Sequence, residues 1–524
     1  MVSMQRPIRS PWIIAILLLA SSSYAAPSRD AFSISWNLDE GSLGSWKKNE
    51  QGEIVLELAP GGESPWYYFQ LDGVRNQTLT FVLEHAPAAW FGEITLPYVS
   101  YDQQEWETLK NRSIQPAPED PASVRYRFTH TFGENRAWLA YAPPYPNSRL
   151  DAFLGAIGPH PHVHIEPVCE TAEKRLPVAC ATLTDPEANE SGKMQVYLMA
   201  REEAQESAGS WVCEGVMRFL LSDNPEAAAM KRRAVFHFIP ILDRDGVTTG
   251  ATRHVLPSGS EAHWSDTWME HDYSFYEQRM IKQHLEQLRE AGKVLSLLVR
   301  FRASPWAPDQ LQREQAGKER YAAQDQLFQD LLGKKYLPWM DNLDRTLPAT
   351  SLSRFAWERF PDAMTGCLQS GLVYAKRFGT AYLLMKTQAD LELEGELLAR
   401  AMGEFMGVPA SDPPPFLHAA ELYQLSGRGK ETFHARCIYR DLLDRPPKEV
   451  RVVVNDQEID LHPENPANKN FAQGVLFTGF ITVSEPINRH YFTASNGSKR
   501  IRLPREGARP GPFTLPDLHA QREP

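Results

Sequence analysis

Two carboxylates stand close together in the stretch AREEAQESAGSW, residues 200–211. Glu203 and Glu206 are separated by two residues and precede an apolar segment with the pattern of a helix. Two carboxylates at this spacing could ligate a metal ion, and such an oxygen-rich pair favours a hard cation. Alternatively, both lie at the start of the helix, where the helix dipole stabilises negative charge. The residue types alone leave both interpretations open.

Three histidines alternate with other residues in the stretch GPHPHVHIEP. His160, His162 and His164 would share one face of a strand, and three clustered imidazoles can bind a transition metal. A polar face near a linker is the more common origin of such a pattern. The stretch is therefore a second, weaker metal candidate. The chain has no Gly-x-Ser-x-Gly elbow, Walker loop or dinucleotide fingerprint.

The overall charge of the chain limits the classes of partner that it can bind. The 524 residues carry 55 Lys and Arg against 66 Asp and Glu, a formal net charge of −11. An acidic chain lacks the positive field that binding to nucleic acid or to an anionic membrane usually needs. We therefore expect no nucleic-acid partner. The length predicts two to four domains.

The N-terminus has the pattern of a signal peptide. Two arginines precede a short apolar run at residues 12–20, and Ser23 and Ala25 fit the small-x-small rule for cleavage after Ala25. The run is too short to span a bilayer comfortably. The sequence therefore predicts a signal peptide at residues 1–25. It also predicts an exported protein, periplasmic or extracellular, with no membrane span after cleavage.

Two of the five cysteines could be linked. Cys169 and Cys180 flank a stretch with the pattern of a hairpin, so a cross-strand disulfide could form in an oxidising compartment. Buried free thiols are the alternative, and the sequence does not decide between the two.

Hydrophobic patterning divides the chain into three folded parts. Residues 26–160 contain short alternating runs separated by turn residues, which predict an antiparallel β-sandwich. Residues 161–410 alternate apolar strand-like runs with amphipathic helices, which predict a mixed sheet covered by helices on both faces. We expect a linker at 411–447, a second small β-sandwich at 448–510, and a loose tail at 511–524.

Aromatic residues are abundant in the N-terminal part, and their simplest role is packing in its core. A sugar-binding face is the alternative that composition leaves open. The residues concerned are Trp66, Tyr67, Tyr68, Phe69, Trp106, Trp138, Tyr141 and Tyr145.

The order of these parts, together with several motifs, resembles the metallocarboxypeptidase superfamily, and specifically its cytosolic-carboxypeptidase-like branch. The N-terminal resemblance lies in SPWYYFQLDGV, VSYDQQEW and AYAPPYP. The central one lies in AREEAQESAGSW, FIPILDRDGVTTGATR and KVLSLLVRFRAS. Together they extend over about residues 32–407. The stretch HYFTASNGSKRIRLPREGARPGP resembles a bacterial Ig-like module. The resemblance implies a β-sandwich, a carboxypeptidase-like α/β domain and a small Ig-like domain.

This family holds Zn²⁺ with two His and one Glu. The resemblance places Glu203 where the first His is expected, Glu206 at the Glu, and Phe301 at the second His. Phe cannot bind a metal, and the neighbouring Arg300 and Arg302 are permanent cations that would repel one. The resemblance therefore implies a degenerate zinc site. We expect no cofactor, with zinc only if the site has been rebuilt.

The positions that would contact substrate have also changed. Arg253 matches the arginine that supports the oxyanion in this family. Glu261, His263 and Trp264 stand in the segment that grips the substrate's terminal carboxylate, and Trp cannot make that bidentate contact.

The general base of the family is a glutamate on a late strand. The resemblance places Gln388 at this position, with Glu392 one turn further on as the alternative. A glutamine cannot accept a proton at neutral pH.

These changes lead to three hypotheses for function. The first is a pseudoenzyme that keeps the carboxypeptidase fold for binding or scaffolding, with a peptide or protein C-terminus or a glycan as ligand. The second is a hydrolase with a rebuilt metal site made from Glu203, Glu206 and His263. The third is a carbohydrate- or surface-binding module in which the two sandwiches bind. The oligomeric state is not predicted.

Overall fold

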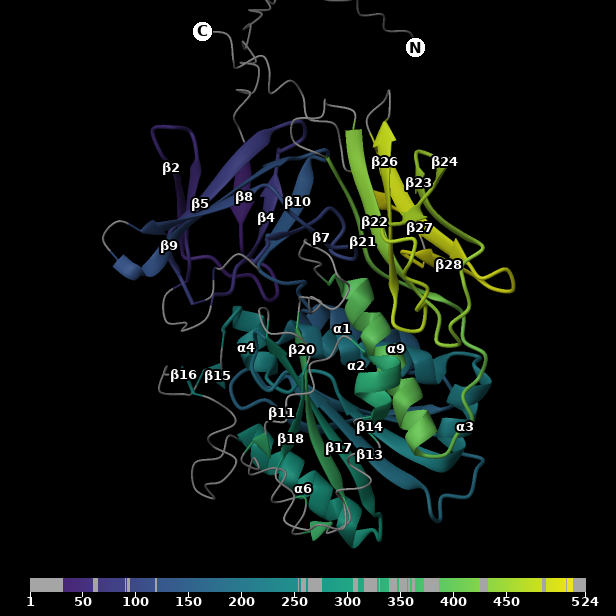
Figure 1. Cartoon of the computed structure of the whole chain (residues 1–524). Helices are drawn as coiled ribbons and strands as arrows, with labels where there is room; N and C mark the ends of the chain where they lie inside the picture. The colour runs from purple at the N-terminus through teal and green to yellow at the C-terminus, as the bar shows by residue number, and fades with distance from the viewer. Residues whose placement is uncertain are drawn as a thin grey trace, which may run out of the picture.

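The computed structural model has three folded parts (Figure 1). It describes residues 32–59, 65–89, 91, 95–117, 120–252, 254–255, 261–262, 276–304, 310–314, 328, 330–338, 346–347, 356, 359–360, 363–371, 386–424, 432–482, 487–505 and 507–511. The predicted signal peptide lies outside these residues. Among the described helices, none is both long enough and apolar enough to cross a bilayer.

The N-terminal part is a sandwich of two five-stranded sheets. The first sheet contains, in spatial order, β1 (Ser33–Ser35), β4 (Tyr68–Asp72), β10 (Arg136–Ala140), β6 (Tyr98–Ser100) and β7 (Glu107–Thr108). The second contains β2 (Ser45–Lys48), β3 (Ile54–Glu57), β5 (Thr78–Pro87), β9 (Asp120–Thr131) and β8 (Arg112–Ala117). All pairs are antiparallel except β3 with β5, which is parallel.

The aromatic residues of this sandwich form its core. All eight that could have made a sugar-binding face are buried, with exposed fractions between 0% and 9%. They pack on one another, as Tyr67 does edge-on to Tyr141 and Tyr68 to Trp106. The sugar-binding alternative is therefore wrong for these residues, because their rings are withdrawn from solvent.

The central part is a mixed eight-stranded sheet with helices on both faces, as predicted. Its spatial order is β11 (Val163–Glu170), β12 (Pro177–Leu183), β14 (Ala234–Ile239), β13 (Met194–Ala200), β17 (Leu295–Ser304), β20 (Met364–Gly371), β18 (Gln310–Glu314) and β19 (Thr346–Leu347). The four middle strands, β14, β13, β17 and β20, are parallel to one another. The apolar runs of β13 and β14 are buried on both sides, which is typical of parallel sheets.

Two helices cover one face of this sheet and a third covers the other. Helices α2 (Ser207–Leu221) and α9 (Gln388–Phe405) share a core with Val299 and Phe301 of β17. Helix α6 (Tyr276–Glu290) shares a separate core with Leu298 of the same strand. The period of two along β17 thus sends alternate side chains to opposite faces. The remaining described elements are α1 (Asn147–Ile157), α3 (Pro225–Arg233), α4 (Arg244–Thr249), β15 (His254–Val255), β16 (Glu261–Ala262) and a π-helical turn, η2 (Leu331–Tyr336).

Helices α2 and α9 cross at two glycines. A Cβ on Gly215 would lie 2.1 Å from the Glu392 carbonyl oxygen, and one on Gly395 would lie 2.1 Å from the Val212 carbonyl oxygen. Only glycine lets the two backbones come this close. The crossing fixes α9 beside α2 on one face of the sheet.

The C-terminal part is also a sandwich, and it begins earlier than predicted. One sheet contains β21 (Phe416–Gln424), β22 (Thr432–Arg440), β26 (Val475–Thr482) and β25 (His462–Pro463). The other contains β24 (Gln457–Asp460), β23 (Glu449–Val454), β27 (Arg489–Ser495) and β28 (Arg500–Leu503), with β29 (Arg509–Pro510) also paired to β27.

The predicted linker at residues 411–447 is therefore wrong, since β21 and β22 lie within it. In both strands charged and imidazole side chains are interleaved with the apolar ones, and many of these polar side chains are nevertheless buried. This mixture hid the strand pattern in the sequence.

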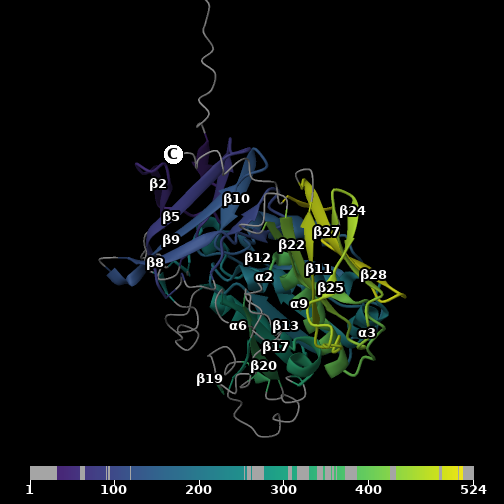
Figure 2. The same ribbon diagram turned by 45° about the horizontal axis from the view of Figure 1, so that its top comes forward.

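The two sandwiches sit side by side at the same end of the central domain (Figures 1 and 2). They are joined directly by an ion pair of 2.6 Å between Lys110 and Glu421. The N-terminal sandwich also binds the central domain. The Tyr98 hydroxyl donates to the Lys386 carbonyl oxygen at 2.8 Å, and Glu40 pairs with Arg201. The three parts thus share buried polar contacts.

The two candidate disulfide cysteines are free thiols in the structure. Cys169 and Cys180 lie on the antiparallel strands β11 and β12, where Cys169 faces Val178 and Cys180 faces Glu166. Both are buried, and burial raises the pKa of each thiol to about 12. The free-thiol alternative is the one that the structure adopts.

Candidate functional site: a carboxylate–arginine cluster

The carboxyl ends of two neighbouring parallel strands position the candidate site. Strand β13 ends at Ala200, which pairs with Phe301 of β17. The loop at residues 201–206 then leads into α2, and Glu206 occupies the N-cap position of that helix. Because parallel strands end at the same edge of a sheet, this register brings Arg302 beside the loop that carries Glu203 and Glu206.

Arg302 binds both carboxylates of the predicted metal motif. Its Nε donates to Glu206 Oε1 at 2.5 Å, and its Nη2 lies 3.2 Å from Glu203 Oε1. The side chains of Glu203 and Glu206 are 3% and 2% exposed, whereas that of Arg302 is 26% exposed. Glu206 does lie at the head of the helix, but both acids are buried against an internal cation.

Two further arginines hold the same loop. Arg300 binds Glu202 through two parallel bonds of 2.5 Å, a bidentate geometry that suits a guanidinium. Arg201 donates to the carbonyl oxygens of Ala204, at 2.5 Å, and Tyr145, at 3.0 Å, and it also pairs with Glu40. The loop at residues 201–206 is thus fastened by Arg201, Arg300 and Arg302.

Burial changes the titration of the acid at the centre of this cluster. Burial raises the pKa of Glu206 to about 7. Arg302 opposes this shift, and the negative charge of Glu203 reinforces it. The second oxygen of Glu206, Oε2, is buried and has no hydrogen-bond partner among the residues that the structure describes. Burial likewise raises the pKa of Glu40 to about 7, against the opposing effect of Arg201. The cluster therefore holds protons at pH values where an exposed glutamate would be ionised.

A pH-dependent stability should follow from Glu206. Its pKa is about 7 in the folded chain against 4.5 for the ordinary group, so between these values the folded state binds more protons than the unfolded state. The free energy of unfolding therefore falls as the pH rises through this window, and the contribution is lost above it. Glu206→Gln cannot ionise and should flatten the fall by up to about 1.4 kcal/mol per pH unit. Unfolding measured from pH 5 to 8 would test this, and an unchanged slope would contradict it.

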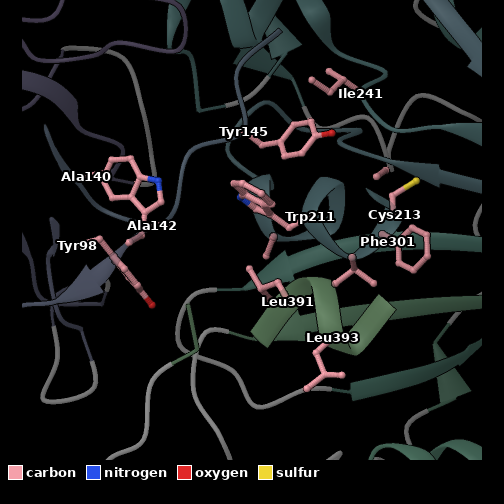
Figure 3. Close-up of a cluster of buried hydrophobic side chains, with 14 of the residues drawn as sticks. Tyr98, Ala140, Ala142, Tyr145, Trp211, Cys213, Ile241, Phe301, Leu391 and Leu393 are labelled. Carbon is pink, nitrogen blue, oxygen red and sulfur yellow. The ribbon is translucent and has the colours of Figure 1, made fainter. Parts of the chain in front are cut away.

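Phe301 points away from the cluster and into the core. Its side chain is 0% exposed and lies on the face of the sheet covered by α2 and α9. Figure 3 shows it among core side chains that include Trp211, Cys213 and Leu391. A Cβ on Gly209 of α2 would lie 3.0 Å from the Phe301 Cβ, so the helix packs directly on this residue. Phe301 is a packing residue at the position where the resemblance placed a zinc ligand.

The residues at this place do not fit a zinc ion. Zinc needs deprotonated ligands with open lone pairs, and here the two candidate carboxylates already accept from a guanidinium. A cation beside them would be repelled by Arg302. Within the ranges that the structure describes, no three His, Cys, Asp or Glu residues are close enough to hold a metal. We therefore derive no chemical step through zinc.

The histidine stretch does not form one cluster. The rings of His160 and His162 lie 5.3 Å apart, and they come before β11 rather than on it. His164 is on β11 and lies 3.5 Å from the Glu166 carboxylate, with both side chains more than half exposed. The prediction of three imidazoles on one strand face is wrong, because the strand begins only at Val163.

The positions that the resemblance assigns to substrate contact lie mostly outside the described residues. This holds for Arg253, His263 and Trp264. Glu261 is seen only through its backbone, which pairs with Val255 between β16 and β15.

Gln388 lies at the start of a helix rather than on a strand. It is the first residue of α9, and its Oε1 accepts from the Trp106 backbone N–H at 3.0 Å. This position joins the central domain to the N-terminal sandwich. Glu392, the alternative base, lies on α9 with its carboxylate 3.6 Å from Arg149. Burial and the charge of Glu214 raise the pKa of Glu392 to about 7.

The sequence interpretation missed how the arginines of β17 act. From the sequence, Arg300 and Arg302 are recognisable only as charges that would repel a metal. A signal was present, however, since two arginines in a buried apolar strand require acidic partners. The run Glu202-Glu203 with Glu206 was the nearest acidic stretch at an adjoining strand end.

Comparison with known proteins gives the family context. Residues 34–142 match the model of the cytosolic carboxypeptidase N-terminal domain. Mouse cytosolic carboxypeptidase 3 is 24% identical over 241 residues, which cover 41% of this chain and 24% of that protein. An uncharacterized protein of Zymomonas mobilis is 25% identical over 232 residues, covering 43% of this chain and 56% of that protein. The matched region spans about half of the Zymomonas protein and about a quarter of the mouse protein.

Solved structures share the fold. A putative carboxypeptidase from Burkholderia mallei superposes with a TM-score of 0.60 at 20% identity, covering 73% of this chain and all of that one. A metallo-carboxypeptidase from Burkholderia cenocepacia gives 0.59 at 19% identity, covering 72% and 99%. At this identity the likeness concerns the fold alone. Residues 34–142 thus match the cytosolic carboxypeptidase N-terminal domain, and the chain is similar to cytosolic carboxypeptidases in sequence and to metallocarboxypeptidases in fold.

Proposed function

We propose that this chain is a carboxypeptidase-fold protein that binds or scaffolds and does not hydrolyse peptides with zinc. One observation carries the proposal. The guanidinium of Arg302 binds both acidic side chains of the zinc motif, at 2.5 Å to Glu206 and 3.2 Å to Glu203. An internal cation in this place occupies one oxygen of each carboxylate, offsets the negative charge that a metal would need, and repels a metal ion.

Two other positions support the same proposal. Phe301 is buried in the core, so no side chain at that position is available as a ligand. Gln388 is engaged by the backbone of Trp106 and has no basic group to accept a proton. Each change removes a different part of the family's hydrolytic machinery, so restoring one of them would not restore the reaction.

The remaining parts of the proposal concern partners and location. We propose a peptide or protein C-terminus or a glycan as ligand, and no nucleic acid, since the net charge of −11 opposes it. We also propose export, on the basis of the signal-peptide pattern at residues 1–25.

The proposal predicts that purified protein contains far less than one zinc per chain. Elemental analysis after dialysis against buffered zinc tests this directly, and peptides with varied C-termini test hydrolysis. Glu203→His alone should still bind no zinc, because Arg302 remains beside the site. Adding Arg302→Ala to Glu203→His removes the cation beside the site, so zinc binding should appear only in this double variant. One zinc per chain in the unmodified protein, lost in Glu206→Ala, would overturn the proposal.

A further inference from the structure

A short segment of the N-terminal sandwich makes three charged contacts with the C-terminal sandwich. The segment spans residues 105–110 and includes β7, which lies beside the C-terminal sandwich (Figure 1). We call these contacts the seam. One of them contains an imidazole, which is the side chain that gains or loses a proton most readily near neutral pH. The three pairs are Glu105–Arg509 at 3.5 Å, Glu107–His490 at 3.3 Å and Lys110–Glu421 at 2.6 Å.

His490 is buried between two oxygen atoms. Its side chain is 0% exposed, with Nδ1 at 2.6 Å from the Gly511 carbonyl oxygen and Nε2 at 3.3 Å from Glu107 Oε1. A carbonyl oxygen can only accept a hydrogen bond, so Nδ1 carries a proton and donates it to Gly511. The second nitrogen, Nε2, then faces the carboxylate in one of two forms. It carries a proton, as in an imidazolium, or it presents a lone pair.

The proton on Nε2 decides whether the contact between His490 and Glu107 attracts or repels. With the proton, an imidazolium and a carboxylate form an ion pair across the two sandwiches. Without it, a lone pair lies against a negatively charged oxygen in a place where little water can screen the repulsion. The joined sandwiches therefore hold this proton more tightly than separated ones would. By linkage, separation becomes easier as the pH rises.

The groups around this pair change little in charge near neutral pH. Burial alone would raise the pKa of Glu107, but the charges of His490 and Arg509 outweigh it, so the pKa is lowered and the group stays an anion. Burial lowers the pKa of His130, on β9, to about 4, so this second imidazole is neutral. The other titratable groups whose charges act here are Arg509, Glu105 and Tyr101.

The strands on either side of His490 contribute one fixed charge. On β29 the residue opposite His490 is Arg509, which is a permanent cation. On β23 the opposite residue is Val454, which is apolar and buried. Burial raises the pKa of Glu105, and Arg509 opposes this shift. The imidazole is thus the group at the centre of the seam that switches its charge.

We propose that His490 is a pH-sensitive clamp between the two sandwiches. Its imidazolium form holds β27 against β7, and release of the Nε2 proton to solvent loosens the seam. The pairs that lack an imidazole, Glu105–Arg509 and Lys110–Glu421, stay in place and limit how far the sandwiches move. The clamp lies away from the carboxylate–arginine cluster, and it does not depend on whether the central domain has lost hydrolysis.

Distances between spin labels on the two sandwiches of the full chain would test the clamp. Gln51→Cys and Ala467→Cys place labels at exposed positions, whereas the four described free cysteines are buried. Pulsed electron paramagnetic resonance should give one narrow distance distribution at pH 6. The fraction of displaced distances should rise by at least about tenfold between pH 6 and pH 8.5, because opening is linked to the loss of one proton.

Two variants remove the switch in different ways. In Glu107→Gln the new amide can donate to the neutral Nε2, so the distribution should stay narrow and change less than about twofold over the same pH range. In His490→Gln no group titrates at this place, so the pH dependence should also be lost. His490 is buried, whereas Glu107 is 26% exposed, so Glu107→Gln is the variant that disturbs the fold less. An unchanged thermal transition would show that each variant is folded.

His164→Gln is the matched control. His164 lies 3.5 Å from Glu166, but both side chains are more than half exposed and lie on the central domain. This variant should keep the full pH dependence of the unmodified chain. Both seam variants also keep Glu40, whose pKa is raised to about 7 by burial and which pairs with Arg201 of the central domain. Loss of the pH dependence in them therefore belongs to the clamp and not to Glu40.

The possible outcomes separate clearly. A distribution in the unmodified chain that is the same at pH 6 and pH 8.5 would overturn the inference. It would also be overturned if folded Glu107→Gln showed the same rise with pH as the unmodified chain, or if His164→Gln abolished that rise. A rise with pH that disappears in both seam variants and persists in His164→Gln would establish the clamp.

Discussion

Arg302→Met should lower the free energy of unfolding of the central domain by about 3–5 kcal/mol at pH 8. The substitution keeps a side chain of similar length but removes the cation. It leaves the carboxylates of Glu203 and Glu206, which are 3% and 2% exposed, without their guanidinium. A buried charge that has lost its partner is far more costly than an exposed one. Denaturant unfolding, combined with hydrogen exchange of peptides spanning residues 201–221, would measure the loss.

Two comparisons make this prediction specific. At pH 6 the loss should be smaller, because the pKa of Glu206 is already about 7 beside Arg302 and rises further without that cation, so this acid is neutral in the variant. Adding Glu203→Gln and Glu206→Gln to Arg302→Met should recover much of the stability, because the buried charges are gone. A loss below about 1 kcal/mol at pH 8 would show that the cluster does not hold the loop.

Gly395→Ala should destabilise the packing of α9 on α2 by about 2–4 kcal/mol. The added methyl group would lie 2.1 Å from the Val212 carbonyl oxygen and 2.7 Å from the Val216 nitrogen, so the two helices must separate. Alanine is otherwise the better helix former by about 1 kcal/mol. A net loss would therefore show that the close approach dominates over helix propensity. Denaturant unfolding followed by helix circular dichroism is the measurement.

Gly155→Ala is the matched control for this prediction. Gly155 also lies within a helix, α1, but a Cβ there meets no heavy atom within 4 Å. The substitution should be neutral or stabilise by up to about 1 kcal/mol. Equal effects of the two substitutions would contradict the view that the α2–α9 crossing requires glycine.

The predicted elements differ in how well the sequence determined them. Strands β13, β14 and β17 and helices α2 and α9 follow from long apolar or strongly periodic runs, and the structure confirms the mixed sheet with helices on both faces. Strands β21 and β22 were missed. Their polar side chains are satisfied by partners on other strands and on the N-terminal sandwich, as Glu421 is by Arg436 and Lys110. A strand whose polar residues are paired through tertiary contacts carries no clean alternation in its own sequence.

In the candidate site, too, some features follow from the sequence and others depend on the tertiary structure. The sequence alone determined that a phenylalanine and a glutamine stand where the family resemblance places a metal ligand and a base. It also determined that arginines flank the phenylalanine, because these are matters of residue identity. Only the tertiary structure decided that Arg302 turns toward Glu203 and Glu206 while Phe301 turns into the core. That outcome depends on the parallel register of β13 with β17, which places Ala200 beside Phe301 and so sets which side chain faces the loop. Strand register is a long-range property, and a shift of one residue would exchange the two faces.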